Sequence, residues 1–191
     1  MTRWEIINFF ILTRGYKSFL EIGTAKGDTF NRVIAERKVS VDPDTSTAAT
    51  YHMTSDEFFM EHQDKFDIIF IDGLHLCQQV YSDITNGLSH LNRNGTIVMH
   101  DCHPYTYMMQ VPIPKIAESQ WWTGDVWKAF VRARATLPYE MYVIDDDLGC
   151  GVIDTSVLKQ SNTDDLPIDM KQMRYKDFLV HPEWMNYKYL K

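Results

Sequence analysis

Residues 66–72 of this 191-residue chain read FDIIFID, and they decide the fold. Apart from the two aspartates the run is apolar, and its isoleucines are β-branched. A strand that is apolar on both faces is typical of the centre of a parallel sheet, because helices cover both sides of such a sheet. We therefore expect a central strand that ends at Asp72.

Strands and helices alternate on both sides of this run. Such alternation with short connections predicts an α/β protein with a three-layer, doubly wound sheet and right-handed crossovers. We expect a mostly parallel seven-stranded sheet with an antiparallel closing strand. The other expected strands are 17–22, 39–41, a short one ending near Met53, 96–99, and a closing antiparallel pair at 139–144 and 151–154; the expected helices are 28–38, one starting at Thr54, 76–91, 125–136 and 169–179.

The length fits one domain, residues 1–191, with an N-terminal helix (1–16), a core (17–155) and a C-terminal helix and tail (156–191). The net charge of −7 argues against a nucleic-acid or anionic-membrane partner, since phosphate neutralisation needs clustered Lys and Arg. The three widely spaced cysteines favour reduced thiols. The apolar run 4–12 is too short to span a bilayer. We expect a cytoplasmic protein.

Four predicted strand ends carry glycines or acids. They are the run 21–27 (EIGTAKG), Asp42, Asp72 and the pair His100 and Asp101. Ligands of open parallel sheets bind outside the carboxyl ends of the strands, so these residues predict a polar site along one edge.

Gly23 and Gly27 remove side chains where the backbone turns sharply and approaches a ligand. Their spacing lacks the alternate glycines of the dinucleotide fingerprint, and Asp28 places a negative charge where a pyrophosphate would sit. The pattern therefore argues against a nicotinamide cofactor.

Asp42 lies about 20 residues beyond this turn, where an acid at the second strand end can accept both hydroxyls of a ribose. The alternative is that Asp42 only opens the turn at Pro43. The glycine turn favours the ribose.

Three stretches, FLEIGTAKG at 19–27, Asp42, and FDIIFIDGLH at 66–75, together resemble the class I S-adenosylmethionine-dependent methyltransferases, most closely their small O-methyltransferase-like branch. The resemblance covers roughly residues 17–155 and implies a Rossmann-like methyltransferase fold. Ala25 stands where the family usually has a middle glycine. The resemblance implies that Glu21, Gly23, Ala25 and Gly27 surround the methionine part of the cofactor, Asp42 holds its ribose, Ser55 and Asp56 flank its adenine, and Asp72 faces the methionine and the acceptor.

Methyl transfer needs a group that removes a proton from the acceptor. Three candidates for catalytic residues lie at the predicted ligand edge, namely His75, His100 and Asp101, and an imidazole titrates near neutrality. His103 is interpreted as a loop residue.

A divalent metal is the competing interpretation. Asp72 and Asp101 could jointly bind a hard cation that lowers the pKa of the acceptor hydroxyl. Metal-dependent catechol-type relatives resemble this arrangement, but they have an amide side chain where Cys102 stands here.

The sequence thus favours methyl transfer from S-adenosylmethionine to a hydroxyl of a small molecule or saccharide. The irregular segment 102–122 would shape the acceptor site, and its aromatic residues could wall it. One alternative is a metal-dependent hydrolase, which leaves Asp42 and the glycine turn unexplained. The other is a non-catalytic binding module with the same fold. The aromatic residues are Tyr105, Tyr107, Trp121 and Trp122, and the hydrolase would use Asp72, His75, His100, Asp101 and His103.

Overall fold

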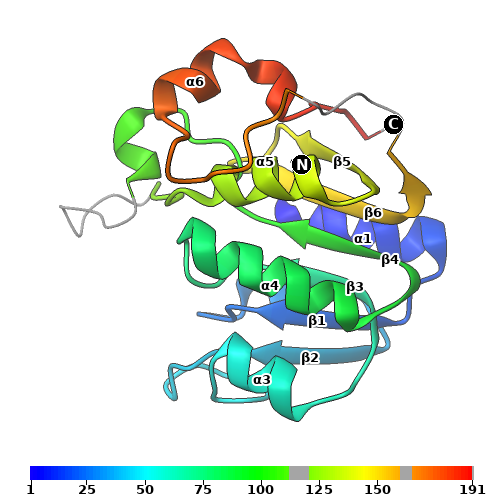
Figure 1. Ribbon diagram of the computed structural model, residues 1–191. Coiled ribbons are helices and arrows are strands. Elements are labelled where there is room, and N and C mark those ends of the chain that lie inside the picture. The colour runs from blue at the N-terminus through cyan, green and yellow to red at the C-terminus, as the bar shows by residue number, and fades with distance from the viewer. Residues whose placement is uncertain (112–120, 160–164, 191) are drawn as a thin grey trace.

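The computed structural model describes residues 1–111, 121–159 and 165–190. Within these residues the strands form one sheet in the order β2-β1-β3-β4-β6-β5 (Figure 1). Strands β2, β1, β3 and β4 run parallel, and β6 is antiparallel to both of its neighbours. The strands are β1 (Ser18–Ile22), β2 (Arg37–Val41), β3 (Phe66–Ile71), β4 (Leu91–Met99), β5 (Tyr139–Ile144) and β6 (Cys150–Leu158).

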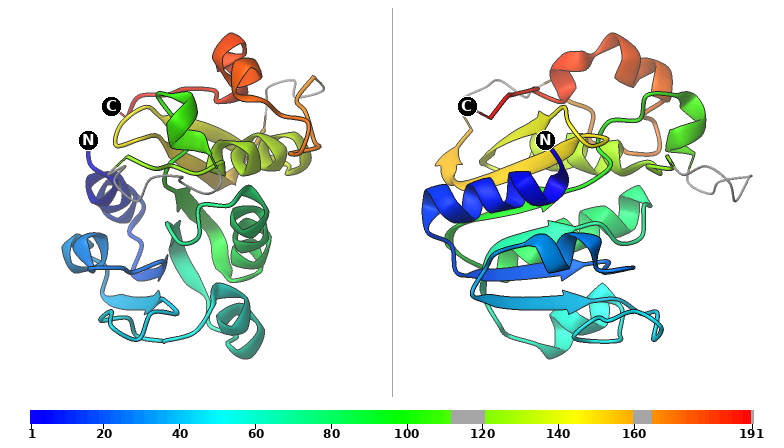
Figure 2. Two further views of the ribbon diagram at one scale, coloured as in Figure 1. Left: turned by 90° about the vertical axis from the view of Figure 1, so that its left-hand side faces the viewer. Right: turned by 180° about the vertical axis from the view of Figure 1, so that it is seen from behind.

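Helices cover both faces of the sheet and complete the expected three layers (Figure 2). α1 (Arg3–Arg14) and α2 (Asp28–Arg32) lie on one face, and α3 (Ser55–Glu61), α4 (Cys77–Ser89) and α5 (Val126–Thr136) on the other. The short helices η1 (Tyr107–Gln110), α6 (Tyr175–Val180) and η2 (Pro182–Trp184) follow later elements of the chain. Within the described ranges, no helix is both long enough and apolar enough to cross a membrane.

Strand β3 is the central strand, as its sequence predicts. Its neighbours are β1 and β4, and its side chains point alternately into two separate parts of the core. Ile69 and Ile71 pack in the cluster that includes α4 and α5 residues, whereas Ile68 and Phe70 pack in the cluster under α1. Burial on both faces explains why β3 is apolar apart from Asp67.

Helix α1 begins and ends where its sequence dictates. Thr2 and Glu5 form a capping box at its start, and Gly15 ends it in the left-handed conformation, with φ 66°. Ile6 and Phe10 are buried against the sheet. Packing of this face fixes the amino-terminal end of α1, with Arg3, beside the ligand edge.

The prediction of seven strands is wrong for the described residues, which form six. The expected strand ending near Met53 is reduced to one bridge, in which Tyr51 donates to the Ser40 carbonyl (3.0 Å) and Asp42 donates to the Tyr51 carbonyl (3.1 Å). Residues 44–53 carry few apolar side chains, so a longer strand there would bury little apolar surface. The antiparallel strand is β6, which lies inside the sheet rather than at its edge.

Two predicted helices are also shorter than expected. α2 ends at Arg32, because Val33 adopts an extended conformation and is buried. The last helix begins at Tyr175 rather than at residue 169. Strand β4 begins at Leu91 rather than at the expected residue 96, and its register with β3 is irregular near its start.

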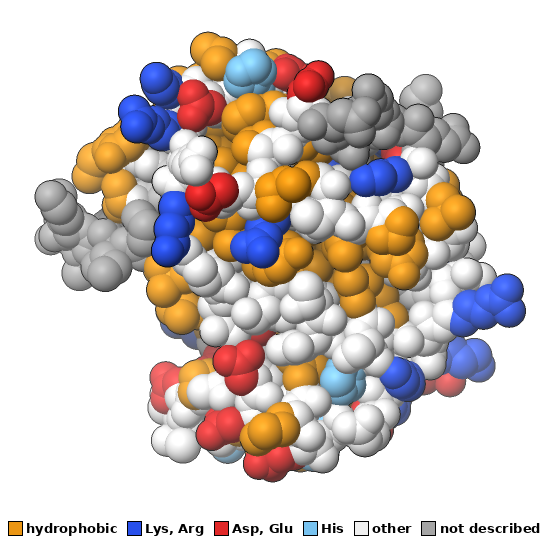
Figure 3. Space-filling model, in the orientation of Figure 1, with side chains coloured by type: hydrophobic (Ala, Val, Ile, Leu, Met, Phe, Trp, Pro, Cys, Tyr) orange, Lys and Arg blue, Asp and Glu red, His pale blue; other side chains and the backbone are white. Residues whose placement is uncertain are grey.

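Acidic side chains gather over α3 on the face of the molecule drawn in Figure 3, and this helix contributes Asp56, Glu57 and Glu61.

Gly23 joins the strand ends. Its N–H donates to the Val41 carbonyl (2.9 Å), and Asp72 donates to the Ile22 carbonyl (2.8 Å), so the ends of β2, β1 and β3 meet at one place. Gly23 has φ +88°, and an added Cβ would lie 2.2 Å from the Asp72 carbonyl oxygen. Only glycine fits there without displacing backbone.

We expect Gly23→Ala to lower the free energy of unfolding by about 2–4 kcal/mol, because the left-handed conformation and the collision with Asp72 both cost energy. Urea unfolding measures the loss. Gly15→Ala is the matched control, since Gly15 has φ +66° with nothing within 4 Å of an added Cβ. Equal losses for the two variants would contradict the close approach at Gly23.

Candidate functional site

A cavity of about 560 Å³ lies over the carboxyl ends of β1, β2 and β3. It gathers most of the residues that the sequence predicts for cofactor binding, although they come from four separate segments. The predicted residues that line it are Gly23, Ala25, Asp42, Ser55, Asp56, Asp72 and His75, and Ile22, Val41, Pro43, Thr54, Gly73, Leu74 and Gln79 complete its wall.

Two predicted cofactor residues lie elsewhere. Glu21 lines a smaller adjoining cavity of about 190 Å³, which shares Gly23, Ala25 and Asp72 with the larger one. Gly27 lines neither of these cavities; its N–H donates to the Thr24 carbonyl (2.7 Å) and it caps α2 with φ 75°. Gly27 therefore shapes the loop without lining either cavity.

Asp42 braces the glycine loop. Its Oδ2 accepts hydrogen bonds from the backbone N–H groups of Thr24 (3.0 Å) and Ala25 (2.8 Å), and its Oδ1 accepts one from Asp44 (2.9 Å). These bonds hold Ala25 at φ 43°, a left-handed conformation in which a side chain is strained. Asp42 thus organises the turn at Pro43 and also lines the cavity.

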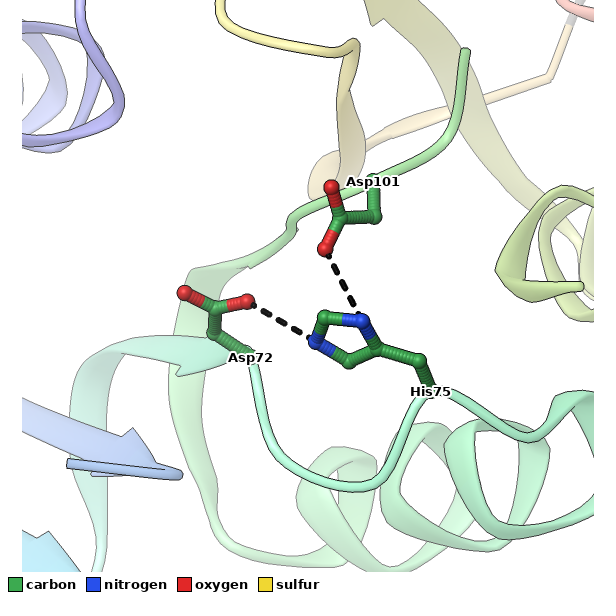
Figure 4. A group of neighbouring side chains, drawn as sticks. All are labelled: Asp72, His75 and Asp101. Atoms are coloured by element: carbon green, nitrogen blue, oxygen red, sulfur yellow. Dashed lines mark ion pairs between the residues drawn. The ribbon is translucent and has the colours of Figure 1, made fainter. Parts of the chain in front are cut away.

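Three side chains form a cluster at the far end of the cavity (Figure 4). His75 lies between two carboxylates, with Nε2 3.5 Å from Asp72 Oδ1 and Nδ1 3.3 Å from Asp101 Oδ2. Asp72 follows β3 and Asp101 follows β4, where Asp101 adopts a left-handed φ of 62°. The Trp122 ring stacks on the imidazole at 4.9 Å. His75 is therefore held from three sides.

His100 lies behind this cluster. It is 6% exposed, and its Nδ1 is 3.2 Å from Asp101 Oδ2 and 3.4 Å from Asp72 Oδ1. Neither His100 nor Asp101 lines either cavity. Of the three predicted catalytic residues, only His75 therefore reaches the cavity; Asp101 contacts His75, and His100 contacts Asp72 and Asp101.

The cluster shifts the pKa values of its own members. Burial alone would raise the pKa of Asp72, but the charge and hydrogen bond of His100 and the hydrogen bond of His75 hold it well below its usual range. Burial opposes the charged form of His75, yet the hydrogen bond to Asp72 and the charge of Asp101 raise its pKa above 6.5. Burial and the nearby Asp72 raise the pKa of Glu21 to about 8.

The same cluster fits a divalent cation. One donor atom each from Asp72, His75 and Asp101 lies within 4.8 Å of the others, and imidazole with carboxylates is a common ligand set for first-row metals. The Cys102 thiol does not join them, because it is fully buried and its Sγ faces the carbonyls of Met99 and His100.

Sequence reasoning missed Gln79, in the first turn of α4. Its Nε2 lies 3.3 Å from Ser55 Oγ, 3.2 Å from Asp56 Oδ1 and 3.1 Å from Asp83 Oδ1. The amide therefore fixes the predicted adenine-binding end of the cavity. The position of Gln79 in the sequence could have indicated this role, because the first turn of the helix after a central strand faces the ligand edge.

The expected acceptor wall is described only in part. Tyr105, Tyr107 and Trp121 are more than half exposed, whereas Trp122 packs on His75. Residues 112–120 of this segment lie outside the described residues.

Comparisons with known proteins agree with this geometry. Residues 20–102 match the family model of a methyltransferase domain. No curated protein matches the sequence.

Solved structures share the fold at low sequence identity. A methyltransferase from Podospora anserina with bound S-adenosylhomocysteine is 14% identical, with a TM-score of 0.62 over 83% of this chain and 78% of that one. An O-methyltransferase from Bacillus cereus in complex with S-adenosylhomocysteine is 11% identical, with a TM-score of 0.57 over 80% of each chain. The O-methyltransferase TomG from Streptomyces achromogenes, which is involved in tomaymycin synthesis and was solved with S-adenosylmethionine, is 12% identical, with a TM-score of 0.59 over 80% of this chain and 78% of that one.

The chain thus shares the fold of these solved methyltransferases, and its residues 20–102 match the model of a methyltransferase domain. The matched residues 20–102 contain the glycine loop, Asp42 and the His75 cluster.

Asp83 beneath Gln79 makes folding depend on pH. It is 1% exposed, and burial raises the pKa of its carboxyl to about 6 from an ordinary 3.8. A raised acid pKa means that the folded state disfavours the carboxylate, so stability present at low pH is lost as the pH rises from about 4 to about 6.

We expect Asp83→Asn to remove this loss. Relative to the unmodified chain, the variant should gain up to about 3 kcal/mol in free energy of unfolding between pH 4 and pH 7. Denaturant unfolding at several pH values measures the difference. Parallel stability curves for the two chains would contradict the burial of an ionised carboxyl.

Proposed function

We propose that this protein transfers the methyl group of S-adenosylmethionine to a hydroxyl group of a small molecule or saccharide. The observation that carries the proposal is the cavity of about 560 Å³ that joins Ser55 and Asp56, Asp42 and His75 along one edge of the sheet. Its size suits a nucleoside with an extended arm. The O-methyltransferases among the similar structures support the choice of a hydroxyl.

In the proposed complex the adenine lies at the end formed by Ser55, Asp56 and Gln79. The ribose hydroxyls donate to Asp42, which keeps acceptor capacity beyond its three backbone bonds. The methionine arm crosses the bend at Gly23, where no side chain intervenes. This order brings the sulfonium toward His75 and Asp72.

Transfer is then an in-line displacement. The acceptor oxygen forms a bond to the methyl carbon while the bond from that carbon to sulfur breaks. The electron pair of the broken bond stays on sulfur, so the cofactor becomes S-adenosylhomocysteine. His75 takes the proton of the hydroxyl, and Asp101 and Asp72 stabilise the imidazolium that results. Trp122 keeps the imidazole in place for this step.

Asp72, Asp101 and His75 are the residues that would hold a divalent cation, and a bound cation would lower the pKa of the acceptor hydroxyl. We propose that transfer does not require one, because Asp72 and Asp101 already have His75 and His100 as partners. A hydrolase at this cluster would leave the nucleoside-sized part of the cavity without a ligand. We also propose a cytoplasmic location, since the three cysteines are free thiols.

Calorimetric titration with S-adenosylhomocysteine tests the cofactor assignment. We expect the unmodified chain to bind it and Asp42→Asn to bind about 10- to 100-fold more weakly, because a charged acceptor for the ribose is lost. Asp44→Asn, an exposed neighbour on the same turn, is the control and should leave the affinity unchanged. No binding by the unmodified chain would refute the cofactor, and equal affinity for Asp42→Asn would refute the ribose contact.

The pH dependence of methyl transfer tests His75 as the base. The imidazole must lose its proton before it can accept another, and its pKa is raised, so kcat/KM should rise with pH through a midpoint above 6.5. A panel of phenols and sugars with labelled cofactor provides the acceptor. His75→Gln should lower the rate about 10²- to 10⁴-fold and abolish the rise of kcat/KM with pH.

A chelator separates the two ways of activating the hydroxyl in the same assay. The pH profile should persist after chelation. Loss of activity that Mn²⁺ or Mg²⁺ restores would show that the cluster works through a metal. An unchanged rise of kcat/KM with pH in His75→Gln would exclude His75 as the base.

A further inference from the structure

Residues 122–125, which lead into α5, contact both the ring and the backbone of His75. The Trp122 ring stacks on the imidazole at 4.9 Å, and the Asp125 N–H donates to the His75 carbonyl (3.3 Å). Gly124 lies so close that an added Cβ would be 1.9 Å from the same carbonyl oxygen. This segment therefore fixes the place of His75 more completely than ring stacking alone would.

The Asp125 carboxylate caps α4 rather than its own helix. Asp125 directly precedes α5, but its side chain makes no cap hydrogen bond there. Its Oδ1 accepts instead from the N–H of Cys77, the first residue of α4 (2.8 Å). The residue before α4 is Leu76, whose side chain has no acceptor, although the first N–H groups of a helix need one. Asp125 thus supplies from another helix the cap that α4 lacks, two residues beyond His75.

Other contacts hold the segment itself in place. Asp125 is 4% exposed, and its Oδ2 accepts from Lys128 Nζ (3.1 Å). The N–H and the hydroxyl of Thr123 both donate to the Met109 carbonyl (2.9 and 3.0 Å), which ties the segment to η1. Because the segment is held on both sides, its position determines that of His75.

The backbone of Trp122 distinguishes the two nitrogens of the His75 ring. Its carbonyl oxygen lies 3.3 Å from His75 Nδ1, and Asp101 Oδ2 lies 3.3 Å from the same nitrogen. A carbonyl oxygen can only accept a hydrogen bond, so Nδ1 carries a proton and donates. In the neutral ring the lone pair then belongs to Nε2. Nε2 is therefore the atom that would take the proton of an acceptor hydroxyl.

We propose that Asp125 is a positioning residue for methyl transfer, which caps α4 and binds the His75 backbone so that the imidazole stays in its Nδ1–H form with Nε2 toward the acceptor. The inference rests on the proposed function, in which His75 is the base, and extends it to a residue outside 20–102. Asp125 lines neither of the two cavities, so its effect passes through His75.

The alternative is that Asp125 only stabilises the fold. A cap with a purely structural role would lower the stability of the chain and leave the form of the His75 ring unchanged. A positioning residue would change the ring as well, and a substitute that still accepts from Cys77 would preserve it.

Nuclear magnetic resonance of the ¹⁵N-histidine-labelled chain separates these roles without an acceptor. Where the imidazole is neutral, the unmodified chain should show His75 in the Nδ1–H form, in a signal that His75→Gln lacks. Asp125→Ala should give a mixture of the two neutral forms, whereas Asp125→Asn, whose amide oxygen can still accept from Cys77, should keep the Nδ1–H form. Asp177→Ala is the matched control, because it removes a carboxylate that accepts from the Arg174 N–H at the start of α6 (2.9 Å), and it should leave the His75 signal unchanged.

Transfer rates of the same variants, measured with labelled cofactor and the acceptor panel, complete the test. Asp125→Ala should lower kcat about 10- to 100-fold, because a displaced base costs rate even when it is intact, and Asp125→Asn should stay within about 3-fold of the unmodified chain. Asp125→Ser, whose shorter side chain reaches Cys77 less well, is the milder variant where Asp125→Ala does not fold, and it should change both measurements in the same direction.

The outcomes separate this role from the proposed function. An unchanged His75 signal and rate in Asp125→Ala or Asp125→Ser would overturn the positioning role while the proposed function stands. Loss of both in Asp125→Asn would do the same, because the cap hydrogen bond would then be irrelevant. Absence of methyl transfer by the unmodified chain to every acceptor of the panel would overturn both, whatever the His75 signal shows.

Discussion

The site depends on one backbone contact, the approach of Gly23 to the peptide that joins Asp72 and Gly73. There is no room for a Cβ between them, since it would lie 2.2 Å from the Asp72 carbonyl oxygen. This contact holds the end of β1 against the end of β3, and the chain then turns away toward Asp42. The space left between the turning loop and the strand ends is the floor of the cavity, and the first turns of α3 and α4 add Ser55, Asp56 and Gln79 to its wall.

Electrostatics organise the other end of the site. The partly buried carboxylate of Asp72 and the buried one of Asp101 would be costly alone, but His75 and His100 lie against both of them. Burial opposes the low pKa of Asp147, yet His100 and Arg3 bring it to about 2. The charges of the cluster therefore stay paired in the absence of ligand. This pairing keeps His75 oriented where a reacting hydroxyl would meet it.

The sequence alone was sufficient for the parts that depend on local pattern. The apolar run 66–71 predicted the central strand, and strand ends in a parallel sheet necessarily share an edge, which brought Gly23, Asp42 and Asp72 together. Features that depend on distant contacts were missed. The strand before Met53 is reduced to one bridge, α2 stops because Val33 is extended and buried, and Arg3 reaches the ligand edge only because α1 packs across the sheet.

A crystal structure of the protein with S-adenosylhomocysteine tests the central claim most directly, because it locates every part of the ligand at once. We expect adenine beside Ser55, ribose hydroxyls on Asp42, the methionine arm over Gly23 and the sulfur atom facing His75. Electron density for the nucleoside at any other surface, with the cavity over Gly23 closed, would contradict it.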